Sequence, residues 1–130
     1  MSQSFTRHER LTERKLIHQL FKEGSTKSVP SIRLRWLFQE LNTPCPVQIL
    51  FSVPKAIIPK ASERNLLKRR MREVYRKHKF ILYDSLESSG RNMILAITYS
   101  SREILSTKEI QEKIIVILQR LKRENEKASK

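Results

Sequence analysis

The stretch SERNLLKRRMREVYRKHK, residues 62–79, carries the strongest structural signal in this chain. Apolar side chains recur in it at Leu67, Met71 and Val74, with spacings of three and four residues that place them on one face of a helix. Neither glycine nor proline interrupts this pattern. We therefore predict a helix with one buried face, and we expect Ser62 to cap its start.

A second face of the same helix is basic. Because an α-helix turns by about 100° per residue, four polar side chains gather on this face with two lysines at its edge: Asn65, Arg69, Arg72, Arg76, Lys68 and Lys79. A solvated charged face is the alternative interpretation, but such faces usually mix signs so that ion pairs form one turn apart. Like charges stacked in this way repel each other by about 0.2–0.5 kcal/mol per pair. The pattern therefore favours contact with a polyanion.

The composition narrows the class of polyanion. The chain has 130 residues and a formal net charge of +14, which favours nucleic acid or an anionic membrane as its partner. No apolar run approaches the ~20 residues that a membrane-spanning helix needs, and the start of the chain lacks a signal-peptide pattern. The single cysteine, Cys45, fits a reducing compartment. We expect a cytoplasmic protein with no membrane partner.

Periodicity and turn residues place the other elements. The predicted order is a helix over about 12–22 that Gly24 ends, strands over 25–30, 32–39 and 47–53, the basic helix to about Leu86, a strand over 92–99, and a last helix from Ser106 or Thr107. The strand over 47–53 is apolar enough to lie centrally in a sheet. This mixed order predicts an α+β fold, a small two-layer sandwich with helix-strand-strand-strand-helix-strand-helix order. We expect one RNA-binding domain over 1–130, with loose ends at about 1–6 and 124–130.

Two further sites offer contacts to a nucleic acid. Ile17 and Phe21 lie one turn apart on the first predicted helix, where they could pack in the core, the reading that the sequence favours, or line a groove in which a base stacks. Arg33 and Arg35 alternate with apolar residues along the second predicted strand and share its other face. This strand face could supply a positive groove beside the first helix.

The sequence contains no arrangement of residues that is typical of a catalytic or metal site. His8, His18 and His78 have no metal-ligand spacing, and no second cysteine accompanies Cys45. No glycine-rich phosphate loop or nucleophile motif is present, and Glu73 carries no catalytic signature. From the residues alone we predict a binding protein with no catalytic group and no metal site of its own.

The residues from Phe51 to Arg76, FSVPKAIIPKASERNLLKRRMREVYR, resemble the signature of the bacterial ribonuclease P protein component. That family has a strand that ends in a Ser-Val-x-Lys-like turn, followed by a helix that opens with Arg-Asn and continues with Lys-Arg and Arg-Glu. This chain has the same residues at the same spacing: Arg64, Asn65, Lys68, Arg69, Arg72 and Glu73. The similarity extends over roughly residues 7–121.

The resemblance implies a function and two RNA surfaces. It implies the protein subunit of an endoribonuclease whose RNA subunit, with Mg²⁺ bound mainly through RNA, removes the 5′ leader from precursor tRNA. The partners implied are ribonuclease P RNA and precursor tRNA, with no protein partner. The basic helix would lie near the catalytic RNA, and a cleft between the first helix and the sheet would receive the leader. The residues concerned are Arg64, Asn65, Lys68, Arg69, Arg72 and Arg76 on the helix, and Ile17, Phe21, Arg33 and Arg35 in the cleft.

The resemblance also implies a left-handed βαβ crossover, against the usual right-handed rule. This sequence departs from the family at three positions: Leu66 replaces a basic residue that often follows Arg-Asn, and Ile17 and Arg35 stand where aromatic residues are common. Leader contact would then depend more on arginines and phosphates than on rings. The alternative function is a general RNA-binding or ribosomal structural protein, which would bind RNA and accelerate no cleavage. A self-sufficient nuclease and a DNA-reading helix-turn-helix fit the sequence less well.

Overall fold

The computed structural model describes residues 4–128. Within them the elements are η1 (Arg7–Glu9, a 3₁₀-helix), α1 (Arg14–Glu23), β1 (Ser25–Val29), β2 (Ile32–Phe38), β3 (Val47–Ser52), α2 (Ala61–His78), α3 (Phe80–Ser89), β4 (Met93–Tyr99) and α4 (Thr107–Ala128). The α+β class and the order of the predicted elements are confirmed, and Gly24 follows α1 as its C-cap. Ser106 caps the start of α4: its hydroxyl accepts from the Glu109 backbone N–H at 3.2 Å, and the Glu109 carboxylate accepts from the Ser106 backbone N–H at 3.2 Å.

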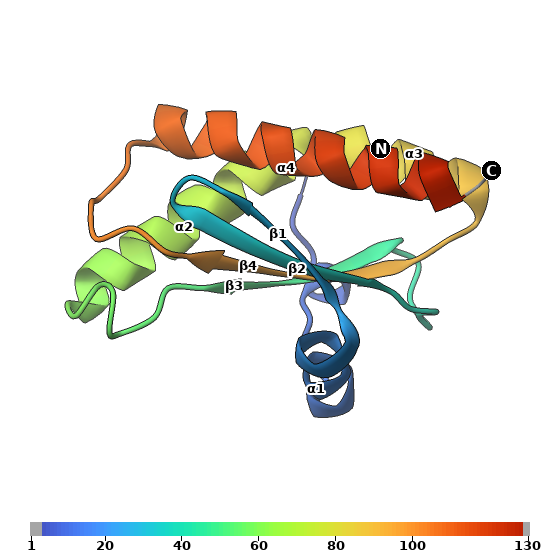
Figure 1. Cartoon of the computed structure of the whole chain (residues 1–130), viewed down its shortest axis with the longest axis horizontal. Coiled ribbons are helices and arrows are strands. Elements are labelled where there is room, and N and C mark those ends of the chain that lie inside the picture. Colours follow the sequence, from blue (N-terminus) through green and yellow to red (C-terminus); the bar gives the residue numbers. More distant parts are fainter. Residues whose placement is uncertain (1–3, 129–130) are drawn as a thin grey trace.

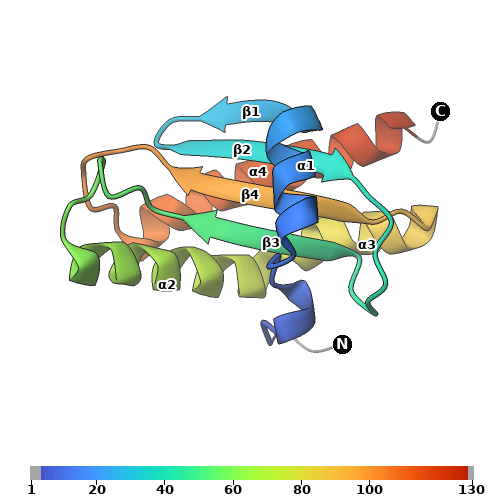
Figure 2. The ribbon, with the colours of Figure 1, turned by 90° about the horizontal axis from the view of Figure 1, so that it is seen from below.

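The strands form a mixed sheet in the order β1-β2-β4-β3. The β1–β2 and β2–β4 pairs are antiparallel, whereas β3 and β4 are parallel. Figure 2 shows the arrowheads of β3 and β4 pointing the same way, with α2 and α3 passing behind the sheet between them. This crossover is left-handed, as the resemblance implied. About 98% of such connections in proteins are right-handed.

Helices lie on both faces of the sheet. In Figure 1, α2, α3 and α4 lie above it and form the second main layer, and α1 lies alone below it. Alternate residues of β2 and β4, such as Leu34 and Leu95, are buried on the side of α2–α4, while Ile94 and Ala96 pack in a smaller cluster with Leu20 of α1. The opposite faces of the sheet are therefore covered to different extents.

The prediction that the strand over 47–53 lies centrally is wrong, because β3 is an outer strand next to β4. Its apolar character has two other causes. Val47 and Ile49 are buried in the cluster that contains the α2 residues. Its outer edge is paired with the start of the chain, since the Leu11 N–H donates to the Ile49 carbonyl at 2.9 Å and Arg10 forms an isolated bridge with Ile49.

Two details of the basic helix are corrected. Ser62 does not cap it: the N-cap is Lys60, whose carbonyl accepts from the Arg64 N–H at 3.0 Å, so the first turn begins before Ser62. The helix also does not continue to Leu86, because α2 ends at His78 and α3 begins at Phe80. The junction residue, Lys79, has its side chain buried, and the sequence pattern misses this break because both helices bury an apolar face in the same cluster.

Residues 4–6 and 124–128, which we expected to be loose, include side chains that make tertiary contacts. Phe5 packs edge-on against Phe51 and Tyr75, with ring centroids 6.1 Å away in each case. At the other end, Asn125 is buried in α4 and donates to the Ser85 carbonyl at 3.1 Å. Both contacts join segments distant in sequence, which local composition does not reveal. Residues 1–3 and 129–130, also expected to be loose, lie outside the described residues.

Candidate nucleic-acid interface

The exposed side of α2 carries the predicted basic residues. Its opposite side buries Leu67, Met71, Val74 and Tyr75. Asn65 and Arg69 are exposed, and Arg72 and Arg76 are half-buried. We call these four residues, Asn65, Arg69, Arg72 and Arg76, the arginine face. The separation of a buried stripe from a basic stripe is therefore as predicted from the 3.6-residue turn.

One acid lies among these cations. The Glu73 carboxylate accepts two hydrogen bonds from Arg76, at 2.6 Å from Nη2 and 3.2 Å from Nε. The bond from Arg76 lowers the pKa of Glu73 below its ordinary value, and the bond to Glu73 raises the pKa of Arg76. Among residues 4–128, Arg69 and Arg72 form no ion pair with a carboxylate within 4.0 Å. Their charges are therefore available to a ligand, while that of Arg76 is partly balanced.

Arg64, at the start of α2, has a structural role. It donates from Nη1 to the carbonyl oxygens of Ile58 at 3.0 Å and Pro59 at 2.7 Å. These bonds tie the loop before α2 to its first turn. Lys68 is half-buried on the same helix. The neighbouring Arg70, which the sequence did not single out, faces the other way and donates to the Leu105 carbonyl at 2.5 Å.

The start of the chain extends this basic surface. We call residues 4–11 the N-terminal segment; in Figure 2 it lies beside β3, close to α2. Its Arg10 guanidinium lies over the Phe5 ring, 5.7 Å from the centroid. A cavity of about 300 Å³ lies between this segment and α2, lined by Phe5, Arg10, Arg69, Arg72, Glu73 and Arg76. We call it the arginine cavity.

A buried ion pair holds the N-terminal segment in place. Lys79 Nζ lies 2.8 Å from Glu9 Oε2, and the two side chains are 3% and 2% exposed. The Tyr83 hydroxyl also donates to Glu9 at 2.7 Å. Burial alone would raise the pKa of Glu9, but the hydrogen bonds from Lys79, the Thr6 backbone and Tyr83 together outweigh it and hold the pKa below its ordinary value. Burial also raises the pKa of Tyr83, so that its hydroxyl stays protonated as the donor.

The second predicted surface consists of Ile17 and Phe21 on α1 and Arg33 and Arg35 on β2. We call it the α1 cleft, after the predicted leader cleft. Phe21 is 44% exposed, so the prediction that it packs in the core is wrong; Leu20, its neighbour, is the residue that α1 buries fully. The Arg35 guanidinium lies 5.2 Å from the Phe21 ring centroid, and its Nη1 lies 3.4 Å from the Phe21 carbonyl oxygen. Arg33 is exposed on the same strand face. Ile17 is half-buried against the α1 cluster.

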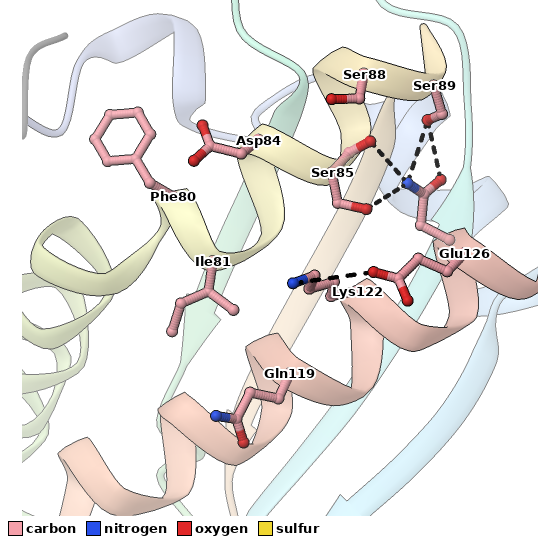
Figure 3. Close-up of a pocket in the computed structure, with 10 residues that line it drawn as sticks. Phe80, Ile81, Asp84, Ser85, Ser88, Ser89, Gln119, Lys122 and Glu126 are labelled. Carbon is pink, nitrogen blue, oxygen red and sulfur yellow. Dashed lines mark hydrogen bonds and ion pairs between the residues drawn. The ribbon is translucent and has the colours of Figure 1, made fainter.

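A different cavity, of about 910 Å³, lies between α3 and α4 (Figure 3). Phe80 and Ile81 supply apolar lining, and Asp84, Lys122 and Glu126 supply charges of both signs. At one end the Asn125 amide bonds to Ser85 and Ser89, as Figure 3 shows. Its mixed charge distinguishes it from the arginine cavity, where guanidinium groups outnumber the carboxylate by four to one.

The described part of the chain shows neither a metal-binding cluster nor a membrane-spanning helix. Within residues 4–128, no three His, Cys, Asp or Glu side chains gather in a way that could hold a metal ion. None of the helices described there is long and apolar enough to cross a bilayer.

The sequence did not single out Phe5 and Arg10, which line the arginine cavity, or Glu9, which is buried, and it misplaced Lys79. It assigned Lys79 to the edge of the basic face, whereas the side chain is buried against a residue 70 positions earlier. No local spacing links Glu9 to Lys79, so their pairing has no signal in a single sequence. The one available cue was the aromatic Phe5 in the segment predicted to be loose, followed closely by Arg7 and Arg10.

Comparison with known proteins gives consistent matches. The family model described as Ribonuclease P matches residues 5–122. A protein named ribonuclease P protein component from Chlorobium phaeobacteroides is 39% identical over 106 residues, which cover 74% of this chain and 71% of the relative. One of the same name from Chlorobaculum tepidum is 41% identical over 61 residues, covering 44% and 40%.

Solved structures show the same fold. The ribonuclease P protein from Thermotoga maritima superposes with a TM-score of 0.69 at 21% identity, covering 86% of this chain and 96% of that one. The protein from Staphylococcus aureus gives a TM-score of 0.67 at 17% identity, covering 85% and 93%. At these identities the likeness concerns the fold.

Proposed function

This chain belongs to the ribonuclease P protein family, and from that membership we propose that it assists ribonuclease P RNA in removing the 5′ leader from precursor tRNA. Within the holoenzyme the RNA subunit carries the catalysis, and the protein binds RNA. The observation that carries the proposal is that the family match spans residues 5–122 and so includes the arginine face and the α1 cleft.

The two surfaces suit different parts of this task. The arginine face presents Arg69 and Arg72 from a rigid helix, as bidentate donors matched to phosphate geometry. Contacts to phosphates give affinity without reading the base sequence, so this face is suited to bind the sugar-phosphate backbone of the RNA subunit. In the α1 cleft, Phe21 offers a ring face beside the Arg35 charge. A few flat side chains in a positive groove are what single-stranded RNA needs, and we assign this cleft to the leader.

We assign Mg²⁺ to the RNA subunit, as the family resemblance implies. The carboxylate nearest the arginine face, Glu73, is engaged by Arg76, so this surface offers guanidinium groups and not carboxylate oxygens to its surroundings. Its role near metal-bound RNA would be to neutralise phosphates. We also propose that the protein acts in the cytoplasm.

A general RNA-binding or ribosomal structural protein is not favoured, because the family match covers most of the chain. Cleavage assays separate the two functions. A leader-bearing precursor tRNA is incubated at low Mg²⁺ with purified ribonuclease P RNA, with this protein, and with both. We expect marked stimulation of leader removal only when both are present.

Two controls make the outcome specific. Mature tRNA without a leader reports binding in the absence of substrate cleavage, and protein alone reports intrinsic nuclease activity. Unchanged cleavage by the RNA subunit despite intact RNA binding would contradict the holoenzyme role. Cleavage by protein alone would contradict the assignment of catalysis to RNA.

A further inference from the structure

We propose that the arginine cavity binds one phosphodiester group of RNA, with Arg10 of the N-terminal segment and Arg69 and Arg72 of α2 closing on it from two sides. The inference rests on the proposed function for its RNA partner, but adds a site and a residue, Arg10, that neither the sequence pattern nor the family resemblance assigned. It also gives the N-terminal segment a task besides covering the β3 edge.

The arginines line one open depression between two segments of the chain. The cavity measures about 300 Å³. Since a water molecule occupies about 30 Å³ in the liquid, there is room for a phosphate group with part of its hydration shell. Arginines reach the recess from two segments far apart in sequence, Arg10 from the start of the chain and Arg69 and Arg72 from α2.

Arg10 is positioned before any ligand arrives. Its guanidinium lies over the Phe5 ring, and that ring is held edge-on by Phe51 and Tyr75. Its backbone is held by the bridge to Ile49. A guanidinium that lies over a ring makes no hydrogen bond to it, so its N–H donors stay free for a bidentate contact with an anion. Less side-chain entropy is then lost when a phosphate binds.

The charge balance favours an anion. Among the described residues, Arg10, Arg69 and Arg72 take part in no ion pair within 4.0 Å. The one carboxylate of the recess, Glu73, is bonded to Arg76 at 2.6 Å. The charges of Glu73 and Arg76 therefore balance each other. The remaining guanidinium groups repel one another, and an anion bound between them would offset this repulsion.

The first experiment tests the site without ribonuclease P RNA. Inorganic phosphate is titrated into the free protein at low ionic strength, and the side-chain Nε–Hε NMR signals of the arginines are followed. We expect the signals of Arg10, Arg69 and Arg72 to shift along one binding curve, and Arg10→Gln to weaken the shifts at Arg69 and Arg72. An Arg10 signal that moves no more than that of Arg7 would overturn the proposal.

Arg7 provides the matched control for RNA binding. It is an exposed arginine of the same segment and does not line the cavity, so Arg7→Gln and Arg10→Gln remove the same charge. We expect Arg10→Gln to reduce the slope of log RNA affinity against log salt concentration by about one unit. Arg7→Gln should leave this slope nearly unchanged. If the two arginines share one phosphate, Arg10→Gln with Arg72→Gln reduces the slope by less than the sum of the single variants.

Two binding measurements identify the source of the phosphate. If Arg10→Gln changes the salt dependence of binding to ribonuclease P RNA alone, the phosphate belongs to the RNA subunit. If the change appears only when the holoenzyme binds precursor tRNA, the phosphate belongs to the substrate. Equal slopes for Arg7→Gln and Arg10→Gln in both arms would overturn the site. If the wild-type protein fails to stimulate cleavage, the proposed function fails, and the phosphate titration still decides the cavity separately.

Discussion

Lys79 and Glu9 form a buried ion pair, with Nζ 2.8 Å from Oε2, across 70 positions of sequence. Lys79 stands where α2 ends and α3 begins, and Glu9 belongs to the N-terminal segment. The pair therefore fixes the start of the chain against the helix that carries the arginine face. Glu9 also accepts from the Thr6 backbone N–H at 2.9 Å, so this short segment is held at several points.

Breaking this pair is expected to destabilise the protein strongly. Lys79→Met leaves the Glu9 carboxylate buried without its cation, which typically costs about 3–5 kcal/mol of unfolding free energy. Urea unfolding measures the loss. The double variant Glu9→Leu with Lys79→Met leaves no unpaired charge and should recover part of it. An unfolding free energy of Lys79→Met within about 1 kcal/mol of the wild-type value would contradict this account.

The same carboxylate predicts a pH dependence. The pKa of Glu9 is held below its ordinary value of 4.5, so the pair stabilises the fold fully above that value. The stabilisation is lost as the pH falls through the lower, folded-state pKa, because the folded carboxylate then takes up its proton. Glu9→Gln should lack this part of the acid sensitivity. A difference in stability between wild type and Glu9→Gln that stays constant below pH 4.5 would contradict the shift.

The arginine face predicts a specific salt dependence. Replacing Arg69 or Arg72 by Ala should reduce the slope of RNA affinity against salt by about one unit each, because each contacts phosphate. Arg70→Gln is the matched control: Arg70 lies in the same helix but donates to the Leu105 carbonyl. It should change the melting temperature more than the slope. Equal slope changes for Arg70 and Arg69 would mean that net charge, and not this face, governs binding.

The α1 cleft predicts recognition of the leader. Phe21→Ala should reduce the preference for leader-bearing precursor over mature tRNA by about 1–3 kcal/mol if a base stacks on the ring. Arg35→Ala should reduce it too, since its guanidinium lies 5.2 Å from the same ring centroid. Val116→Ala on α4 is the control, because Val116 is 37% exposed and Phe21 is 44% exposed. Unchanged preference in both cleft variants would remove the leader from this surface.

The local pattern predicted most of the elements well. The alternation from Ile32 to Phe38 separates the buried residues of β2 from Arg33 and Arg35, and the structure keeps that division. The pattern was less informative for Phe21, since the same spacing suits a core residue and an exposed ring. Only the position of α1 on the sheet shows that Leu20 is buried and Phe21 is not.

The sequence by itself determined which side of each helix and strand is apolar, and thus that α2 has a basic face. Periodicity carries this information because it depends on the turn of one element alone. Only the tertiary structure decided that β3 is an outer strand, that Lys79 is buried on Glu9, and that Arg10 joins the arginine cavity. These features depend on contacts between distant segments, and periodicity records that a residue is buried but not what buries it.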